Sequence, residues 1–170
     1  EDLVALVHVD SARARPERLA PLFERAATGA LVVIVVGDAG DGEHRCALVR
    51  SLWAHVAARD WTAMRAAFAD GAVMHWPVSG ERFEGADLIV RVNADHPEGW
   101  SIDVHAVDAL ADGRVLSSVT VDHDGQRFFT QSLWRFDGAR IVEATEHWAS
   151  AEAPPAWRSA ERFGPGYTRH

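Results

Sequence analysis

The sequence contains a single cysteine, Cys46, among its 170 residues and no lysine, so all 17 basic residues are arginines. One cysteine cannot form an intramolecular disulfide, which excludes a disulfide-stabilised framework. It leaves the compartment open, with the reducing cytoplasm as the default expectation. Long apolar runs are also missing: the longest, residues 30–36, is much shorter than the ~20 residues of a membrane span. We therefore expect no membrane partner.

Positive charge is scarce as well. The net charge is −8 at pH 7, the isoelectric point is near 5.5, and no block of basic residues occurs. Nucleic acids attract proteins through a positive field, so no nucleic-acid partner is expected. What the sequence does contain is 48% hydrophobic and 25% charged residues, the composition of a globular protein that can bury a core.

The first 42 residues differ from the rest and are predicted to be an N-terminal extension of unknown role. Two β-prone runs, residues 3–9 and 30–36, flank a segment with helical spacing at 16–28. This order predicts two parallel strands joined by a right-handed crossover. Glycine and aspartate at 37–42 predict a flexible joint, and the acidic residues argue against a phosphate-binding loop. The chain begins at Glu1 without an initiator Met, so we expect it to start inside a longer natural chain.

From residue 43 the pattern becomes regular, with predicted helices first and predicted strands afterwards. The helices are predicted at residues 43–59, 61–69 and 86–94, with a strand at 72–76 and a turn at 80–85 between the last two. Four alternating segments separated by Asp-Gly pairs predict strands at 101–110, 114–123, 126–136 and 140–149. The result is an α+β domain over 43–150, in which a curved antiparallel sheet wraps around the helices. Residues 151–170 are predicted to be an extended tail in which Trp157 and Phe163 are packed, at a place that the sequence does not specify.

The turn at Asp124-Gly125 fixes which side chains of the central hairpin share a face. A two-residue turn pairs Val121 with Phe128, Val119 with Thr130, Ser117 with Ser132, and Val115 with Trp134. This face is predicted to be the concave interior. The opposite face carries Phe129 and Leu133 among polar residues, and we expect a homodimer to form through it.

The last strand raises the question of where Glu146 points. A three-residue loop at 137–139 turns Val142, Ala144, Glu146 and Trp148 inward, whereas a two-residue turn turns the alternate set inward. Apolar content favours the first arrangement. Glu146 is then the one charged side chain on an apolar stripe, and a buried carboxylate must be protonated, paired or in contact with water.

Four stretches of residues 43–150 resemble the SnoaL-like group of polyketide cyclases and their relatives, within the nuclear transport factor 2-like superfamily. They are residues 52–61 (LWAHVAARDW), 68–77 (FADGAVMHWP), 80–85 (GERFEG) and 140–148 (RIVEATEHW). The resemblance implies a cone-shaped α+β barrel, usually dimeric, with a deep apolar pocket at its open end.

The catalytic residues of this superfamily carry over only in part. In ketosteroid isomerase the residue before the matching proline is the aspartate base, and here it is Trp76. The tyrosine of that enzyme falls at Leu52 and its second acid near Ser132, so steroid isomerisation by that mechanism is not expected. In limonene epoxide hydrolase a catalytic aspartate occupies the position of Glu146, although its partner arginine and aspartate have no evident equivalents here.

Two functions remain open. In the first, the domain is a cofactor-free isomerase, cyclase or dehydratase with Glu146 as general acid or base. In the second, it is a non-catalytic ligand-binding or dimerisation module, and Glu146 only accepts hydrogen bonds from Trp76, Trp53 or Ser132.

Both functions imply a small apolar, aromatic or cyclic ligand. The predicted ligand-binding residues are Leu52, Trp53, Met74, Trp76, Thr130, Ser132, Trp134 and Trp148. Asn93 either reaches the rim of the pocket or serves the end of its helix. The histidines lack the spacing of a zinc site, so neither a metal nor a cofactor is predicted.

Overall fold

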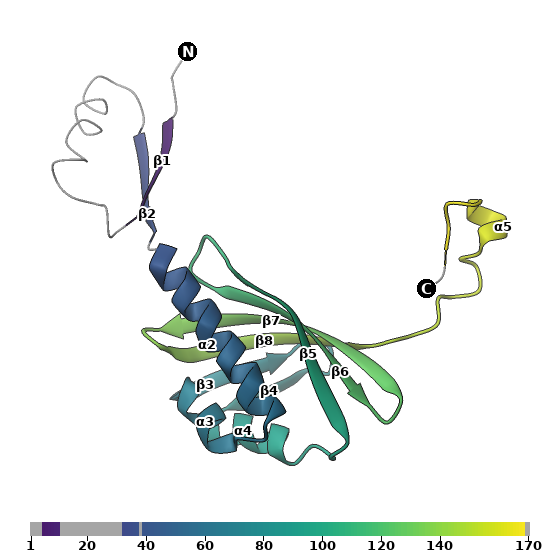
Figure 1. Cartoon of the computed structure of the whole chain (residues 1–170), viewed down its shortest axis with the longest axis horizontal. Coiled ribbons are helices and arrows are strands. Elements are labelled where there is room, and N and C mark those ends of the chain that lie inside the picture. Colours follow the sequence, from purple (N-terminus) through teal and green to yellow (C-terminus); the bar gives the residue numbers. More distant parts are fainter. Residues whose placement is uncertain (1–4, 11–31, 38, 169–170) are drawn as a thin grey trace.

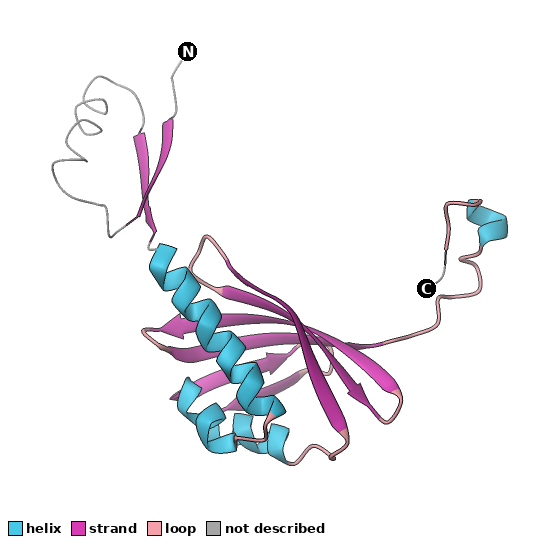
Figure 2. Cartoon of the chain, in the orientation of Figure 1, coloured by secondary structure: helices cyan, strands magenta, loops and turns pink. Residues whose placement is uncertain are grey.

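The structure is a computed structural model that describes residues 5–10, 32–37 and 39–168 (Figures 1 and 2). Its helices are α2 (Ala39–Ala57), α3 (Trp61–Ala67), α4 (Ala86–Ala94) and α5 (Ala160–Phe163). Its strands are β1 (Ala5–Asp10), β2 (Val32–Gly37), β3 (Phe68–Trp76), β4 (Glu81–Glu84), β5 (Trp100–Ala109), β6 (Val115–His123), β7 (Gln126–Asp137) and β8 (Arg140–Ser150).

The N-terminal extension contains the predicted parallel strand pair. β1 and β2 pair in parallel, with Ala5 opposite Val32. The predicted helix at 16–28, and with it the hand of the crossover, lies outside the described residues. The predicted flexible joint at 37–42 is wrong over its described residues, because Gly37 ends β2 and residues 39–42 form the first turn of α2. A Cβ atom added at Gly42 would be 3.1 Å from the Cβ of Ala109, so the small residue lets this turn pack closely against β5.

The main sheet has six strands in the order β4-β3-β8-β7-β6-β5 and curls around α2, α3 and α4 (Figure 1). Strands β5 to β8 form the predicted antiparallel meander. The sheet as a whole is mixed, however, because β3 pairs in parallel with β8, and it is curled rather than closed into a barrel. The turn predicted at 80–85 contains the short edge strand β4, which pairs with β3.

The boundary between α3 and β3 lies earlier than predicted. Phe68 already has an extended backbone and is fully buried, so the strand begins there instead of at residue 72. The pairing of β3 with β8 is irregular between Phe68 and Val73, where Asp70-Gly71 interrupts the alternation. That irregularity is why the first part of the strand does not look like one in the sequence. The helix α4 has the predicted bounds.

The predicted register of the central hairpin is confirmed. The four pairs Val121–Phe128, Val119–Thr130, Ser117–Ser132 and Val115–Trp134 all occur. Their face is the interior of the domain: Ser117, Thr130 and Ser132 are fully buried although they are polar.

The last hairpin turns Glu146 inward, as predicted, but by a different device from the predicted three-residue loop. Asp137 pairs with Arg140 across a two-residue turn. The register then shifts, so that Arg135 pairs with Glu143 and Val142 is the extra residue of a β-bulge. The bulge reverses the faces that the short turn alone would give, and Glu146 comes to lie opposite Ser132.

The outer face of the sheet carries Phe129 and Leu133, the two apolar residues that were predicted for a dimer contact. Phe129 is 45% exposed, and Leu133 is partly buried. The homodimer itself stays a prediction, as does the cytoplasmic location. In the part of the chain that the structure describes, no helix is long and apolar enough to cross a membrane.

The C-terminal tail runs away from the end of β8 (Figure 1). Trp157 and Phe163 pack against each other, with ring centroids 6.1 Å apart, and each remains about half exposed. The expected packing of these rings is therefore local to the tail. The tail is irregular except for the single-turn helix α5.

One buried hydroxyl group organises the side of the core where α2 meets the sheet. The Nε1–H groups of Trp53 and Trp134 both donate to Oγ of Ser117, at 3.1 and 2.9 Å. The two indole rings meet edge to face, with centroids 5.9 Å apart. A single acceptor thus satisfies two indoles that would otherwise be buried without partners.

We predict that Ser117→Ala lowers the free energy of unfolding by about 2–3 kcal/mol, because it leaves two buried N–H donors without an acceptor. Denaturant unfolding followed by circular dichroism measures this loss. The control is Ser118→Ala, one residue along on the opposite face, where the hydroxyl accepts a hydrogen bond from the exposed Gln131. That change should cost less than about 0.5 kcal/mol. Equal losses for the two variants would contradict the role of Ser117.

Candidate functional site

Glu146 is the one charged side chain buried in the described core, at 3% exposure. Three neutral donors bind its carboxylate. The Nε1–H groups of Trp76 and Trp148 donate to Oε2 at 2.9 and 3.2 Å, and the hydroxyl of Ser132 donates to Oε1 at 3.0 Å. The hydroxyl oxygens of Ser132 and Thr130 lie 3.4 Å apart, so the hydrogen-bonded polar side chains around Glu146 continue along β7. Among the described residues, no arginine or histidine forms an ion pair with Glu146.

This environment raises the pKa of Glu146. Burial is the main cause, because the ionised form loses its hydration when it is enclosed in an apolar interior. The hydrogen bonds from Trp76, Trp148 and Ser132 act in the opposite direction, since they stabilise the charge, but they do not outweigh the burial. In the described part of the chain, no cation is paired with the carboxylate to restore an ordinary pKa.

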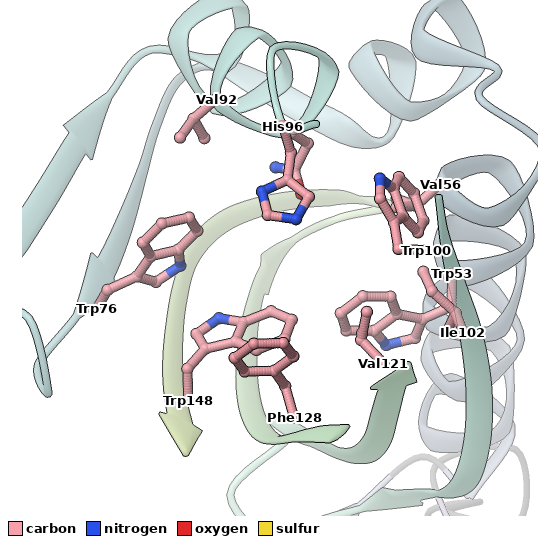
Figure 3. Close-up of a pocket in the computed structure, with 11 residues that line it drawn as sticks. Trp53, Val56, Trp76, Val92, His96, Trp100, Ile102, Val121, Phe128 and Trp148 are labelled. Carbon is pink, nitrogen blue, oxygen red and sulfur yellow. The ribbon is translucent and has the colours of Figure 1, made fainter. Parts of the chain in front are cut away.

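A cavity of ≈ 180 Å³ lies beside the two indoles that bind Glu146 (Figure 3). Nine of its lining residues are apolar and two, Asn93 and His96, are polar. The apolar ones are Trp53, Val56, Trp76, Val92, Trp100, Ile102, Val121, Phe128 and Trp148. They come from α2, α4 and the strands β3, β5, β6, β7 and β8, so the cavity lies between the helices and the concave face of the sheet.

The structure brings three of the predicted ligand-binding residues, Trp53, Trp76 and Trp148, to the wall of this cavity. The other predicted residues belong to the buried core and are not among the side chains that line it. They are Leu52, Met74, Thr130, Ser132 and Trp134. Glu146 is also absent from the lining and is linked to the cavity only through the indoles of Trp76 and Trp148.

The hydrogen bonds of Glu146 match two of the three partners considered from the sequence. Trp76 and Ser132 do bind it, whereas the N–H of Trp53 is directed to Ser117. Asn93 lines the cavity, and its amide donates at 2.8 Å to the carbonyl of Ile89, one turn earlier in α4, whereas the C-cap of the helix is Asp95.

Sequence reasoning missed Trp100 and His96. Trp100 precedes the predicted start of its strand, and His96 lies in a turn without any motif. Val121 and Phe128 were on the face predicted to be concave, so the hairpin register contained the signal that could have placed them in the pocket.

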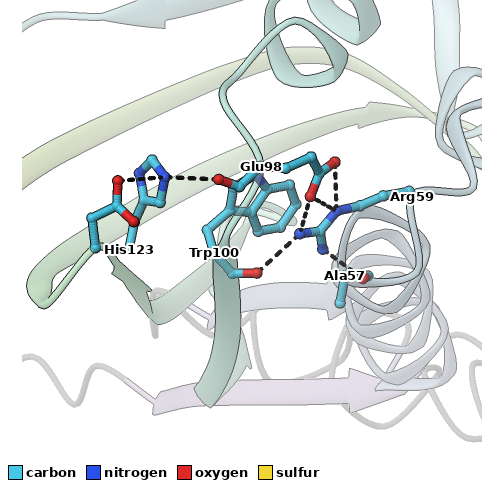
Figure 4. Close-up of polar contacts among 6 residues, drawn as sticks. Ala57, Arg59, Glu98, Trp100 and His123 are labelled. Atoms are coloured by element: carbon cyan, nitrogen blue, oxygen red, sulfur yellow. Dashed lines mark hydrogen bonds and ion pairs between the residues drawn. The ribbon is translucent and has the colours of Figure 1, made fainter.

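A network of polar contacts surrounds Trp100 at one end of the cavity (Figure 4). The guanidinium of Arg59 lies 3.3 Å from the centre of the Trp100 ring. It also donates a hydrogen bond to the backbone carbonyl oxygen of Trp100 at 2.9 Å. Arg59 also pairs with Glu98 at 2.9 Å, and His123 lies 3.2 Å from the Glu98 carbonyl oxygen. These contacts fix one face of the Trp100 indole and leave the nitrogen edge free of them.

A metal site is not evident. Within residues 5–10, 32–37 and 39–168, no three His, Cys, Asp or Glu side chains gather as metal ligands would.

The sequence profile of the SnoaL-like domain matches residues 49–144, which is more than half of the chain. The chain therefore belongs to the SnoaL-like domain family, as the resemblance indicated. No curated protein matches the chain.

Solved structures with the same fold agree with this assignment. A proposed ketosteroid isomerase from Kribbella flavida is similar with a TM-score of 0.64 and 25% identity, over 72% of this chain and 88% of that one. A nuclear transport factor 2-like protein of unknown function from Burkholderia xenovorans follows with a TM-score of 0.61 and 22% identity, over 68% and 91%. A proposed isomerase from Bacillus subtilis has a TM-score of 0.55 and 23% identity, over 63% and 87%. The last two show the fold alone.

The raised pKa of Glu146 predicts how stability depends on pH. Its proton is held more tightly in the folded chain than in the unfolded chain, where the ordinary value is 4.5. The stability that this group contributes is therefore complete below pH 4.5 and is lost as the pH rises through the raised pKa. Glu146→Gln keeps a neutral side chain at every pH. We expect the free energy of unfolding of the wild type, relative to this variant, to fall between pH 4 and pH 8.

Urea denaturation of both proteins across that range measures the difference between their free energies of unfolding. The contributions of the other titrating groups are common to both proteins and cancel in this difference. A difference that stays constant, or that rises with pH, would show that folding does not raise the pKa of Glu146.

Proposed function

We propose that the domain binds a small, flat and mostly apolar molecule in the indole-lined cavity. The observation that carries this proposal is the lining itself, in which four indoles, those of Trp53, Trp76, Trp100 and Trp148, line one partly open cavity. Aromatic side chains offer large, rigid surfaces that stack on planar ligands with little loss of conformational entropy. Such a lining with few polar groups is typical of small-molecule sites.

The volume of the cavity limits the size of the ligand. A cavity of about 150 Å³ lined by aliphatic and aromatic side chains is large enough for benzene. The ≈ 180 Å³ here therefore suits one ring or two fused rings rather than a steroid, unless the walls move. Burial of such a ligand removes apolar surface from water and supplies the binding free energy.

Glu146 supports this binding function by holding two walls of the cavity. Its Oε2 atom accepts from Trp76 on β3 and from Trp148 on β8, so one carboxylate fixes the orientation of both indoles. The rings lie edge to face with centroids 6.3 Å apart. On this proposal Glu146 is a positioning residue that does not touch the ligand.

We predict that tetralin, an apolar molecule of two fused rings, binds with a dissociation constant of about 1 mM or lower. Val92→Trp places a large side chain in the cavity and should weaken this binding more than about tenfold. Val78→Trp is the control, because Val78 is 69% exposed and does not line the cavity. Isothermal titration calorimetry measures both. The proposal fails if tetralin does not bind, or if the two variants bind it equally.

A second candidate function is proton transfer to or from the ligand, with Glu146 as general acid or base in a cofactor-free isomerase, cyclase or dehydratase. The raised pKa of Glu146 favours it, since general acid–base catalysis works best when that pKa approaches the operating pH. The similarity to a proposed ketosteroid isomerase supports the same class of reaction. This function requires Trp76 or Trp148 to move away from Oε2, because their indoles lie between the carboxylate and the cavity.

Hydrogen exchange of a ketone distinguishes the two functions. If Glu146 transfers protons, the protein should accelerate replacement of the C2 hydrogens of 1-tetralone by deuterium in D₂O, and Glu146→Gln should reduce this rate at least about 100-fold. Proton NMR follows the exchange. Glu143→Gln, on the outward face of the same strand, should leave the rate unchanged. If 1-tetralone binds without accelerated exchange, Glu146 is a positioning residue only.

A further inference from the structure

Trp100 carries an unsatisfied polar group at the wall of the cavity. The side chain is 8% exposed and lines the cavity. Its Nε1–H is buried and lacks any hydrogen-bond partner, and it is the only such side-chain atom among the described residues. A buried N–H without an acceptor costs free energy, so its presence at the lining of a cavity points to an acceptor supplied by the ligand.

The other cavity indoles make this contrast clear. Trp76 and Trp148 donate to Glu146, and Trp53 donates to Ser117. Each of these N–H groups is satisfied by the protein and has no need of a ligand. Among the four indoles that line the cavity, only that of Trp100 has an N–H group without an acceptor.

His96 lies next to the free donor. The rings of His96 and Trp100 have centroids 6.4 Å apart, and Figure 3 shows the nitrogen edge of Trp100 turned toward His96. The His96 side chain is exposed, and partial desolvation, followed by the neighbouring His123, lowers the pKa of its imidazole, which is therefore mainly neutral at pH 7. A neutral imidazole provides one N–H donor. Together with Asn93, these two side chains supply the polar groups of a cavity whose other lining residues are apolar.

The charges around Trp100 and His96 favour a neutral acceptor over an anion. Asp95, Glu98 and Asp124 are all exposed there. Among the described residues, the arginine in contact with Trp100 is Arg59, and it is already paired with Glu98. A carboxylate ligand would meet these three acidic side chains against the single charge of Arg91, which lies beside Asp95 and His96, whereas the oxygen of a neutral carbonyl group carries no charge to be repelled.

We propose that the ligand of this pocket carries a neutral carbonyl oxygen, which accepts a hydrogen bond from Nε1–H of Trp100 beside His96. This inference rests on the proposed function, because it assumes that the cavity binds a small apolar molecule. It adds a requirement on the ligand: one ketone or aldehyde oxygen at one end of a flat apolar body. The apolar body lies against Trp53, Trp76 and Trp148.

A matched pair of probes tests this requirement. Tetralin and 1-tetralone have the same fused rings and differ by the carbonyl oxygen. Isothermal titration calorimetry on the full chain should give a dissociation constant for 1-tetralone that is about tenfold lower than that for tetralin, the effect of one hydrogen bond to an otherwise unsatisfied donor. Trp100→Phe keeps an aromatic ring and removes the donor, so the ratio of the two constants should fall to about one. Trp61→Phe, outside the cavity lining, should leave the ratio at about ten.

The indole N–H resonances of the wild-type protein give a second readout that does not depend on the folding of a variant. The Nε1–H signal of Trp100 should move downfield with 1-tetralone and much less with tetralin. Equal affinity for both probes, or an unmoved Trp100 signal on ketone binding, would overturn the carbonyl requirement while leaving apolar binding intact. Failure of both probes to bind would overturn the proposed function together with this inference.

Discussion

A carboxylate bound only by neutral donors is the interaction on which the arrangement of this domain depends. Glu146 lies inside the curled sheet, and none of the described residues supplies a cation to balance it. Its three hydrogen bonds come from three different strands: Trp76 from β3, Ser132 from β7 and Trp148 from β8. The cost of burying the acid is thus met partly by these bonds and partly by retention of its proton. In return, the group joins the parallel and antiparallel parts of the mixed sheet and sets the orientation of two indoles at the cavity wall.

Indole N–H groups and small polar acceptors recur as a pair throughout the interior. Ser117 satisfies Trp53 and Trp134 in the way that Glu146 satisfies Trp76 and Trp148. Three of the four indoles that line the cavity, those of Trp53, Trp76 and Trp148, therefore have an acceptor within the protein for their N–H groups. Trp100 departs from this pattern, because its buried N–H has no acceptor among the described residues. A ligand in the cavity could supply that acceptor.

The sequence determines much of this arrangement through local signals. The Asp124-Gly125 turn sets the hairpin register, and the register places Ser117, Ser132 and Trp134 inside. The inward direction of Glu146 follows from the apolar content of its strand, although the bulge at Val142 that produces it has no signal of its own.

The remaining features depend on contacts between distant parts of the chain. The parallel pairing of β3 with β8 joins segments about 70 residues apart, and no local pattern specifies a strand's neighbour. For the same reason, the cavity gathers Trp100 and His96 with Trp76 and Trp148 only once the sheet has curled. Three of the eight predicted ligand-binding residues reach the cavity because alternation distinguishes inside from outside but does not distinguish a cavity wall from a filled core.

The central claim is that Glu146 retains its proton more tightly than an exposed glutamate, because burial outweighs its three hydrogen bonds. The direct measurement is a ¹³C NMR titration of the side-chain carboxyl carbons, with Glu146→Gln used to assign the signal. We expect the Glu146 carbon to titrate with a midpoint above the ordinary value of 4.5. A midpoint at or below 4.5 would mean that Trp76, Trp148 and Ser132 stabilise an ionised carboxylate, and would contradict the claim.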